Sequence, residues 1–265
     1  MNAPQIPAVC NLCQSPEPTH ETRRSFLWKL AGGLAVSAGM LCTRRVLGQP
    51  ATSAPLPTPN GRASWARLIT SSPFWALHAE QDAAVANFIR REAHLNLDAT
   101  SYSVDPANLD ALAAFPFIFT NALTAVVDSQ QLDNLKEYLQ RGGFFFVEGC
   151  LDHRVTRSFN SFMGGHLALF EKLAPGCVVR KFAPNHPIFR AYFPVEERKL
   201  SLIEPTDDDL RWKGAPQALY GIFQKSRMIS LISLQHLQCE WFTKPEKVPF
   251  CMQQIANIYI YAMTR

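Results

Sequence analysis

The sequence predicts an α/β fold with a mostly parallel central sheet, on the evidence of two apolar stretches and the helix between them. Residues 117–120 and 144–147 lack the polar–apolar alternation of half-exposed strands, and this is typical of strands that are buried on both faces. The 23 residues between them exceed the dozen or so that a parallel crossover needs. This segment therefore predicts a βαβ unit in the middle of the sheet.

One strand and two helices are expected before this unit. Residues 66–70 form a short, largely apolar run that predicts the strand. The first helix is expected over 82–92, where apolar residues recur three and four positions apart, as they do along one helical face. The second is expected over 105–113, because Asp105 and Pro106 are a typical N-cap and first helical residue.

The helix inside the unit has clear signals at both ends. Asp128 with Gln131 three positions later resembles a capping box, which marks the start of a helix. Gly142 and Gly143 tolerate the left-handed backbone that ends many helices, and the apolar stretch 144–147 follows at once. A strand that begins directly after a helix end fits the crossover.

Further helices and strands are expected downstream, with an irregular stretch over 184–217. In chain order they are helices at 155–163 and 167–173, separated by Gly164 and Gly165, a strand at 177–180, a hairpin of strands at 219–223 and 228–234, and an amphipathic helix over 255–262.

Residues 1–50 have the properties of an export signal. Arg23 and Arg24 precede an apolar run over 30–42, which is shorter than the roughly 20 residues that span a bilayer. The run has the length of a signal-peptide core. Residues 22–27 resemble the twin-arginine export motif, so we expect Arg23 and Arg24 to bind the export machinery.

These features predict a mature protein that is periplasmic or otherwise extracytoplasmic, with no stable membrane span. Residues 51–64, rich in Pro, Ser and Thr, are expected to form a linker, and residues 65–265 a single domain. The alternative is that the N-terminal segment stays uncleaved and anchors the chain in the membrane.

The charge distribution argues against a nucleic-acid partner. The chain has a formal charge of +4, and three of these four charges belong to residues 1–50. A nearly neutral body offers no broad basic surface. No phosphate-binding glycine loop precedes a helix, so no cofactor is predicted. No resident metal is predicted either.

Reactive side chains are densest directly after residues 144–147. Ligands of open parallel sheets bind beyond the carboxyl ends of the strands. Cys150, Asp152 and His153 are placed there, and His186 could supply a remote imidazole for a thiol nucleophile. These four residues are the candidate catalytic residues.

Other roles for this turn stay open. His236 is a second remote imidazole. Cys150 could simply pack as a small apolar residue while Asp152 caps the next helix. Glu148, Asp152 or His153 could instead hold a metal together with a remote histidine.

Five short motifs resemble the domain of unknown function 4159 family. They are FW at 74–75, FPF at 115–117, GGF at 142–144, HPIF at 186–189 and YGI at 220–222. More distantly, they are similar to ThuA-like proteins and to the class I glutamine amidotransferase-like fold. The resemblance implies a flavodoxin-like three-layer sandwich over roughly residues 65–265.

In the amidotransferases that this chain resembles, the catalytic cysteine lies in a G-x-C-x-G turn after a strand. Gly149 and Cys150 resemble part of that turn, while Asp152 stands in place of its second glycine. We therefore expect a non-catalytic binding or assembly module of the cell envelope, with an unknown small molecule or envelope protein as its partner. The alternative is a hydrolase or amidase-like enzyme that uses the turn from Cys150 to Asp152.

Overall fold

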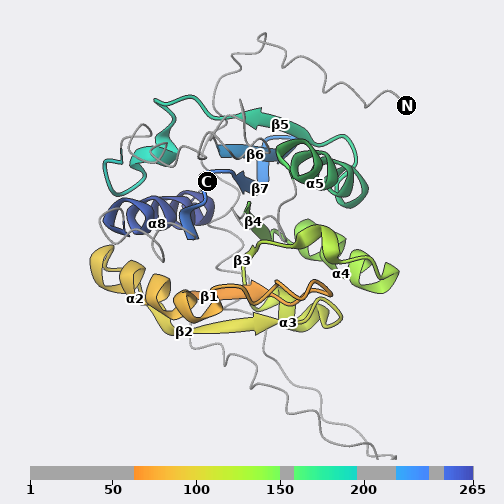
Figure 1. Cartoon of the computed structure of the whole chain (residues 1–265), viewed down its shortest axis with the longest axis horizontal. Coiled ribbons are helices and arrows are strands. Elements are labelled where there is room, and N and C mark those ends of the chain that lie inside the picture. Colours follow the sequence, from red (N-terminus) through yellow and green to blue (C-terminus); the bar gives the residue numbers. More distant parts are fainter. Residues whose placement is uncertain (1–62, 150–157, 196–218, 239–247, 265) are drawn as a thin grey trace, which may run out of the picture.

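A computed structural model describes residues 63–149, 158–195, 219–238 and 248–264 of the chain (Figure 1). These residues form an α/β fold around one seven-stranded sheet with the order β2-β1-β3-β4-β7-β6-β5. The strands are β1 (Ala63–Leu68), β2 (Leu97–Val104), β3 (Phe117–Thr120), β4 (Phe144–Glu148), β5 (Val178–Lys181), β6 (Leu219–Gln224) and β7 (Arg227–Ser233).

The helices lie in two layers, one on each face of the sheet. Figure 1 shows α2 and α8 on one face, and α3, α4 and α5 on the other. Their bounds are α2 (Asp82–Glu92), α3 (Leu109–Ala113), α4 (Ser129–Gln140), α5 (Phe159–Leu173) and α8 (Val248–Thr264), with short 3-10 helices η1 (Ala79–Gln81), η2 (Leu123–Ala125) and η3 (Pro187–Arg190). No helix among these described residues is long and apolar enough to cross a membrane.

The sheet is mixed. Strands β2, β1, β3, β4 and β7 are parallel to one another, whereas β6 is antiparallel to both β7 and β5. The expected hairpin of β6 and β7 is present, and it supplies the antiparallel part. The prediction of a mostly parallel sheet is therefore confirmed for β2, β1, β3, β4 and β7. The other edge of the sheet, formed by β6 and β5, is antiparallel.

The triple-phenylalanine strand β4 is the middle strand of the seven, as its apolar sequence predicts. All five of its residues are buried. Phe144 and Phe146 pack into the core under α2 and α8, while Phe145 packs into the core under α3, α4 and α5. The alternation of side chains along a strand thus connects both cores through β4.

The end of α4 needs its glycine at position 143. The Tyr138 hydroxyl donates to the Phe144 carbonyl and accepts from the Phe144 N–H, both at 3.1 Å. A Cβ atom on residue 143 would lie 2.3 Å from the Tyr138 ring. At the other end, Asp128 caps the helix by accepting the Gln131 N–H at 3.0 Å, so the predicted capping box is confirmed at its first residue.

Three sequence expectations need correction. Gly164 and Gly165 do not separate two helices, because α5 runs through both of them and buries one continuous apolar face. The helix expected from residue 105 begins at Leu109, because Asn108 caps it by accepting the Ala111 N–H. Strand β2 was not expected at all, since its eight residues are partly exposed at the edge of the sheet and mostly polar.

Candidate functional site

The carboxyl ends of the parallel strands β1, β3, β4 and β7 meet at one edge of the sheet, called here the carboxyl edge. The turn that sequence analysis singled out follows β4 at this edge. Cys150, Asp152 and His153 lie outside the described residues, so their roles stay predictions. The last described residues before them in the sequence are Glu148 and Gly149.

Glu148 fastens the segment after β7 to the end of β4. Its side chain is 2% exposed, and its two carboxylate oxygens accept the backbone N–H groups of Leu237, at 2.5 Å, and Gln238, at 3.0 Å. Gly149 adds a third link by donating its N–H to the Ser233 carbonyl at 2.9 Å. A buried carboxylate needs such hydrogen bonds, and those of Glu148 hold the segment after β7 against the end of β4.

His236 is held against the same turn. Its ring is fully buried, and Nδ1 lies 3.0 Å from the Gly149 carbonyl oxygen, to which it donates. The His236 backbone is left-handed, with φ of 52°, which is uncommon for a residue with a side chain. Backbone strain of this kind is often kept at functional sites. The structure therefore brings His236 next to the residue that precedes Cys150.

His186 has the contacts of a helix cap. Its Nδ1 accepts the Ile188 N–H at 3.3 Å at the start of η3. Its ring stacks on Phe182, with centroids 3.8 Å apart, and also contacts Tyr261 of α8. Phe182 directly follows β5, which is three strands away from β4 in the sheet. A catalytic role for His186 beside Cys150 stays a prediction.

The strand order reverses between β1 and β3, and the loops that follow these two strands are joined by hydrogen bonds. Reversal points of this kind are common ligand sites in open α/β sheets. Here Ser71 donates its hydroxyl to the Ala125 carbonyl at 2.6 Å, and the Asn121 amide donates to the Phe74 carbonyl at 3.3 Å. The loops after β1 and β3 are therefore fastened to each other.

A buried ion pair supports the loop after β1. Arg67 on β1 and Asp82 on α2 form two hydrogen bonds, at 2.6 and 2.7 Å, and both side chains are nearly unexposed. The same guanidinium donates to the Trp75 and Leu77 carbonyls and lies 4.6 Å from the centroid of the Phe119 ring. Burial raises the pKa of Asp82, and Arg67 offsets part of that rise.

Sequence analysis missed this pair and two buried glutamines. A signal for the pair was available, because Arg67 is the one charged residue inside an otherwise uncharged strand. No comparable signal exists for Gln235, just after β7, and Gln254, on α8. Both are fully buried, and among the described residues neither amide nitrogen nor amide oxygen of either side chain has a hydrogen-bond partner.

Replacing Gln254 with methionine, which has a similar shape, is expected to raise the free energy of unfolding by about 1–2 kcal/mol. Each buried amide group without a partner costs about 1–3 kcal/mol, and a thioether removes that cost. Urea unfolding followed by circular dichroism measures the change. Buried polar groups without a hydrogen-bond partner are rare in folded proteins, and functional sites are among the places where they occur at a cost in stability.

Asn257 provides a matched control on the same helix. It is also fully buried, but its amide accepts the N–H groups of Tyr192 and Phe193 and donates to the Phe193 carbonyl at 2.8 Å. Asn257→Leu should therefore lower stability, by about 2 kcal/mol or more. A loss of stability in Gln254→Met of the same size would mean that its amide is satisfied in solution.

These features define the class of protein as a three-layer α/β domain. Its buried Glu148, Gln235 and His236 lie at or just after the ends of β4 and β7. A comparison with models of protein families matches residues 64–263 to the family described as Domain of unknown function (DUF4159). The match covers most of the chain, and the chain belongs to this family. No curated protein matches the chain.

Among the described residues, no group of three or more His, Cys, Asp or Glu side chains could hold a metal ion.

Proposed function

We propose that this protein is a non-catalytic binding or assembly module of the cell envelope, built on a flavodoxin-like, amidotransferase-like scaffold. The strand order supports the scaffold, because β2-β1-β3-β4-β7 follows the order 2-1-3-4-5 of flavodoxin-like folds, with β7 in the fifth place. The partner is a small molecule or an envelope protein that binds at the carboxyl edge.

One observation carries the proposal. Glu148 precedes Gly149 on the chain, and His236 is hydrogen-bonded to Gly149; both side chains are buried, and both are hydrogen-bonded to backbone atoms of this edge. A general acid or base must reach the proton that it transfers, within about 3 Å of a substrate atom or one water away. Groups engaged in holding two loops together are better suited to shaping a binding edge than to proton transfer.

The test compares the unmodified protein with Cys150→Ala in assays for hydrolysis of glutamine, a p-nitroanilide and a p-nitrophenyl ester. We expect the same background rate for both proteins. A rate that falls by a hundredfold or more in Cys150→Ala would overturn the proposal.

A second experiment tests for assembly. Gentle extraction of the envelope should release the protein in particles larger than the purified chain, as measured by size-exclusion chromatography.

A second candidate function, a hydrolase or amidase-like enzyme, is favoured by the placement of His236. The imidazole lies beside Gly149, so it could activate a thiol on the next residue. The reaction of Cys150 with iodoacetamide, followed by mass spectrometry from pH 5 to 10, separates the two functions. If Cys150 is an activated thiol, its rate of alkylation reaches its maximum well below pH 8.5, the ordinary pKa of cysteine. In His236→Asn the rate should instead rise only near that ordinary pKa. A binding module gives no such acid shift.

Export by the twin-arginine route is part of the same proposal. It predicts that replacing Arg23 and Arg24 with lysine leaves the protein in the cytoplasm, as measured by cell fractionation and immunoblotting. The matched control replaces Arg44 and Arg45 with lysine, which keeps the charge and leaves the motif intact. Normal delivery of the Arg23→Lys/Arg24→Lys protein would refute this route. A full-length product resistant to carbonate extraction would instead support an uncleaved anchor.

A further inference from the structure

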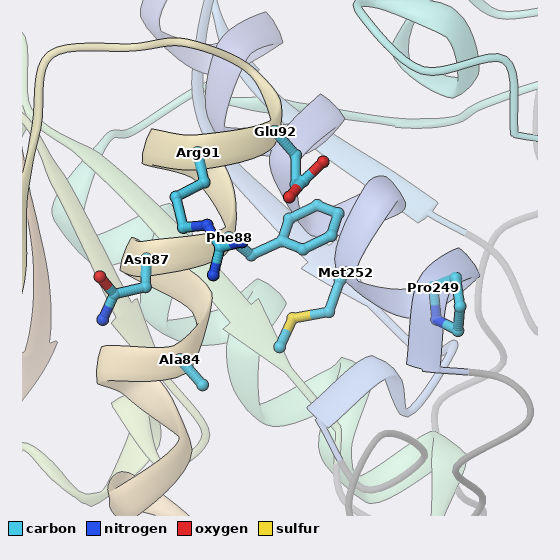
Figure 2. A pocket seen from close by; sticks show the side chains of 7 residues that line it. All are labelled: Ala84, Asn87, Phe88, Arg91, Glu92, Pro249 and Met252. Atoms are coloured by element: carbon cyan, nitrogen blue, oxygen red, sulfur yellow. The ribbon is translucent and has the colours of Figure 1, made fainter.

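A shallow apolar groove of about 380 Å³ lies between α2 and α8, on the outer side of one helical layer. Figure 2 shows Phe88 of α2 and Met252 of α8 pointing toward each other across it. Pro249 and Ala84 extend the apolar lining, and Arg91 stands at the rim. The groove is small, with room for a few side chains of another chain segment, and polar groups lie beside its apolar lining.

The start of the described chain lies close to one end of this groove. The N–H of Ala63, the first residue of β1, donates to the Asn96 carbonyl at 3.3 Å. Asn96 comes only four residues after Glu92, which ends α2 and lines the groove. Ala63, the first described residue, therefore lies beside the segment that follows this end of α2.

Those residues have the composition that such a groove binds. Residues 54–59 read Ala-Pro-Leu-Pro-Thr-Pro, and no charged residue occurs between positions 46 and 61. Sequences of this kind favour the polyproline II conformation, which needs little further ordering when it binds a groove. This groove offers one aromatic ring, that of Phe88, with Met252 and Pro249 as its other large apolar side chains. We propose that residues 54–59 of this chain bind in the groove between α2 and α8.

The distances allow this arrangement. At about 3.3 Å per residue, residue 59 can lie up to about 13 Å from Ala63, and residue 54 up to about 30 Å. Helix α2 is about 17 Å long at 1.5 Å per residue, so the segment can follow its whole length. A short tether also gives an effective concentration in the millimolar range, so a contact with a Kd below that concentration is occupied most of the time. This inference does not depend on the proposed function.

The test places the photoreactive amino acid p-benzoylphenylalanine at position 56 of the full chain, in place of Leu56. After irradiation, mass spectrometry should find intramolecular cross-links to peptides containing residues 84–92 or 249–252. The same amino acid in place of Thr52 serves as a positional control, and it should give at least fivefold fewer cross-links to these peptides.

A second pair of variants tests the groove itself. Ala84 is exposed, so Ala84→Glu should fold normally while placing a charge in the apolar lining, and it should reduce the cross-links from position 56 at least fivefold. Ala107→Glu introduces the same charge at an exposed residue away from the groove and should leave them unchanged. Cross-links between two copies of the chain, or cross-links that persist in Ala84→Glu, would overturn the proposal.

Discussion

Replacing Arg67 with methionine is expected to lower the free energy of unfolding by about 3–5 kcal/mol. The change leaves the Asp82 carboxylate buried without its cation, and removal of one partner of a buried ion pair has costs of this size. It also removes the donor for the Trp75 and Leu77 carbonyls in the loop after β1. Urea unfolding of the unmodified and variant proteins at pH 7 measures the loss.

The double variant Arg67→Met/Asp82→Leu is the control for this prediction. If the cost comes from an unpaired charge, removal of both charges should restore most of the lost stability, because apolar pairs of similar size often replace buried ion pairs without loss. Burial already raises the pKa of Asp82 in the presence of Arg67, so the desolvation cost of its charge is large. A double variant as unstable as Arg67→Met would show that the two backbone contacts of Arg67 matter more than the pair.

Much of the fold could be predicted because local signals and burial agree. The apolar β3 and β4, the Asp128 cap and the glycines after α4 all specify one βαβ unit, and the structure contains it. Prediction failed where tertiary packing overrides a local preference. Gly164 and Gly165 interrupt a helical pattern in the sequence, yet the buried face formed by Phe162, His166 and Leu169 carries α5 through them.

Less of the candidate site could be predicted. Its position at the end of β4 follows from the general behaviour of parallel sheets, and Glu148 was a candidate because it is adjacent in sequence. The link from Glu148 to Leu237 and Gln238 joins residues about 90 positions apart, and no pattern in the sequence indicates it. His236 could be named only as one of two remote imidazoles, and its contact with Gly149 depends on the pairing of β4 with β7.

Acid should destabilise this protein through His166 on α5, which titrates far from its ordinary range. Its ring is fully buried, and burial lowers the pKa of His166 from 6.5 to about 4, while the hydrogen bond from Nδ1 to the Phe162 carbonyl, 2.7 Å long, offsets a part of the shift. The folded protein therefore keeps this imidazole neutral at pH values where the unfolded chain binds a proton.

The sign of the effect follows from this difference. Above pH 6.5 neither state is protonated at His166, and stability does not depend on it. As the pH falls from 6.5 to about 4, protons bind preferentially to the unfolded chain, so the free energy of unfolding decreases by about 3 kcal/mol. Below pH 4 both states are protonated and the contribution levels off.

The measurement is urea unfolding at half-unit steps from pH 4 to 7.5 for the unmodified protein and for His166→Gln, which has no titrating group at this position. The variant will differ in stability at neutral pH, because the ring also packs against Phe162, so the two slopes are compared rather than the two absolute values. We expect the variant to lose about 3 kcal/mol less than the unmodified protein over this range. Parallel curves for the two proteins would mean that His166 becomes protonated in the folded state as readily as in the unfolded chain, and that its burial is incomplete in solution.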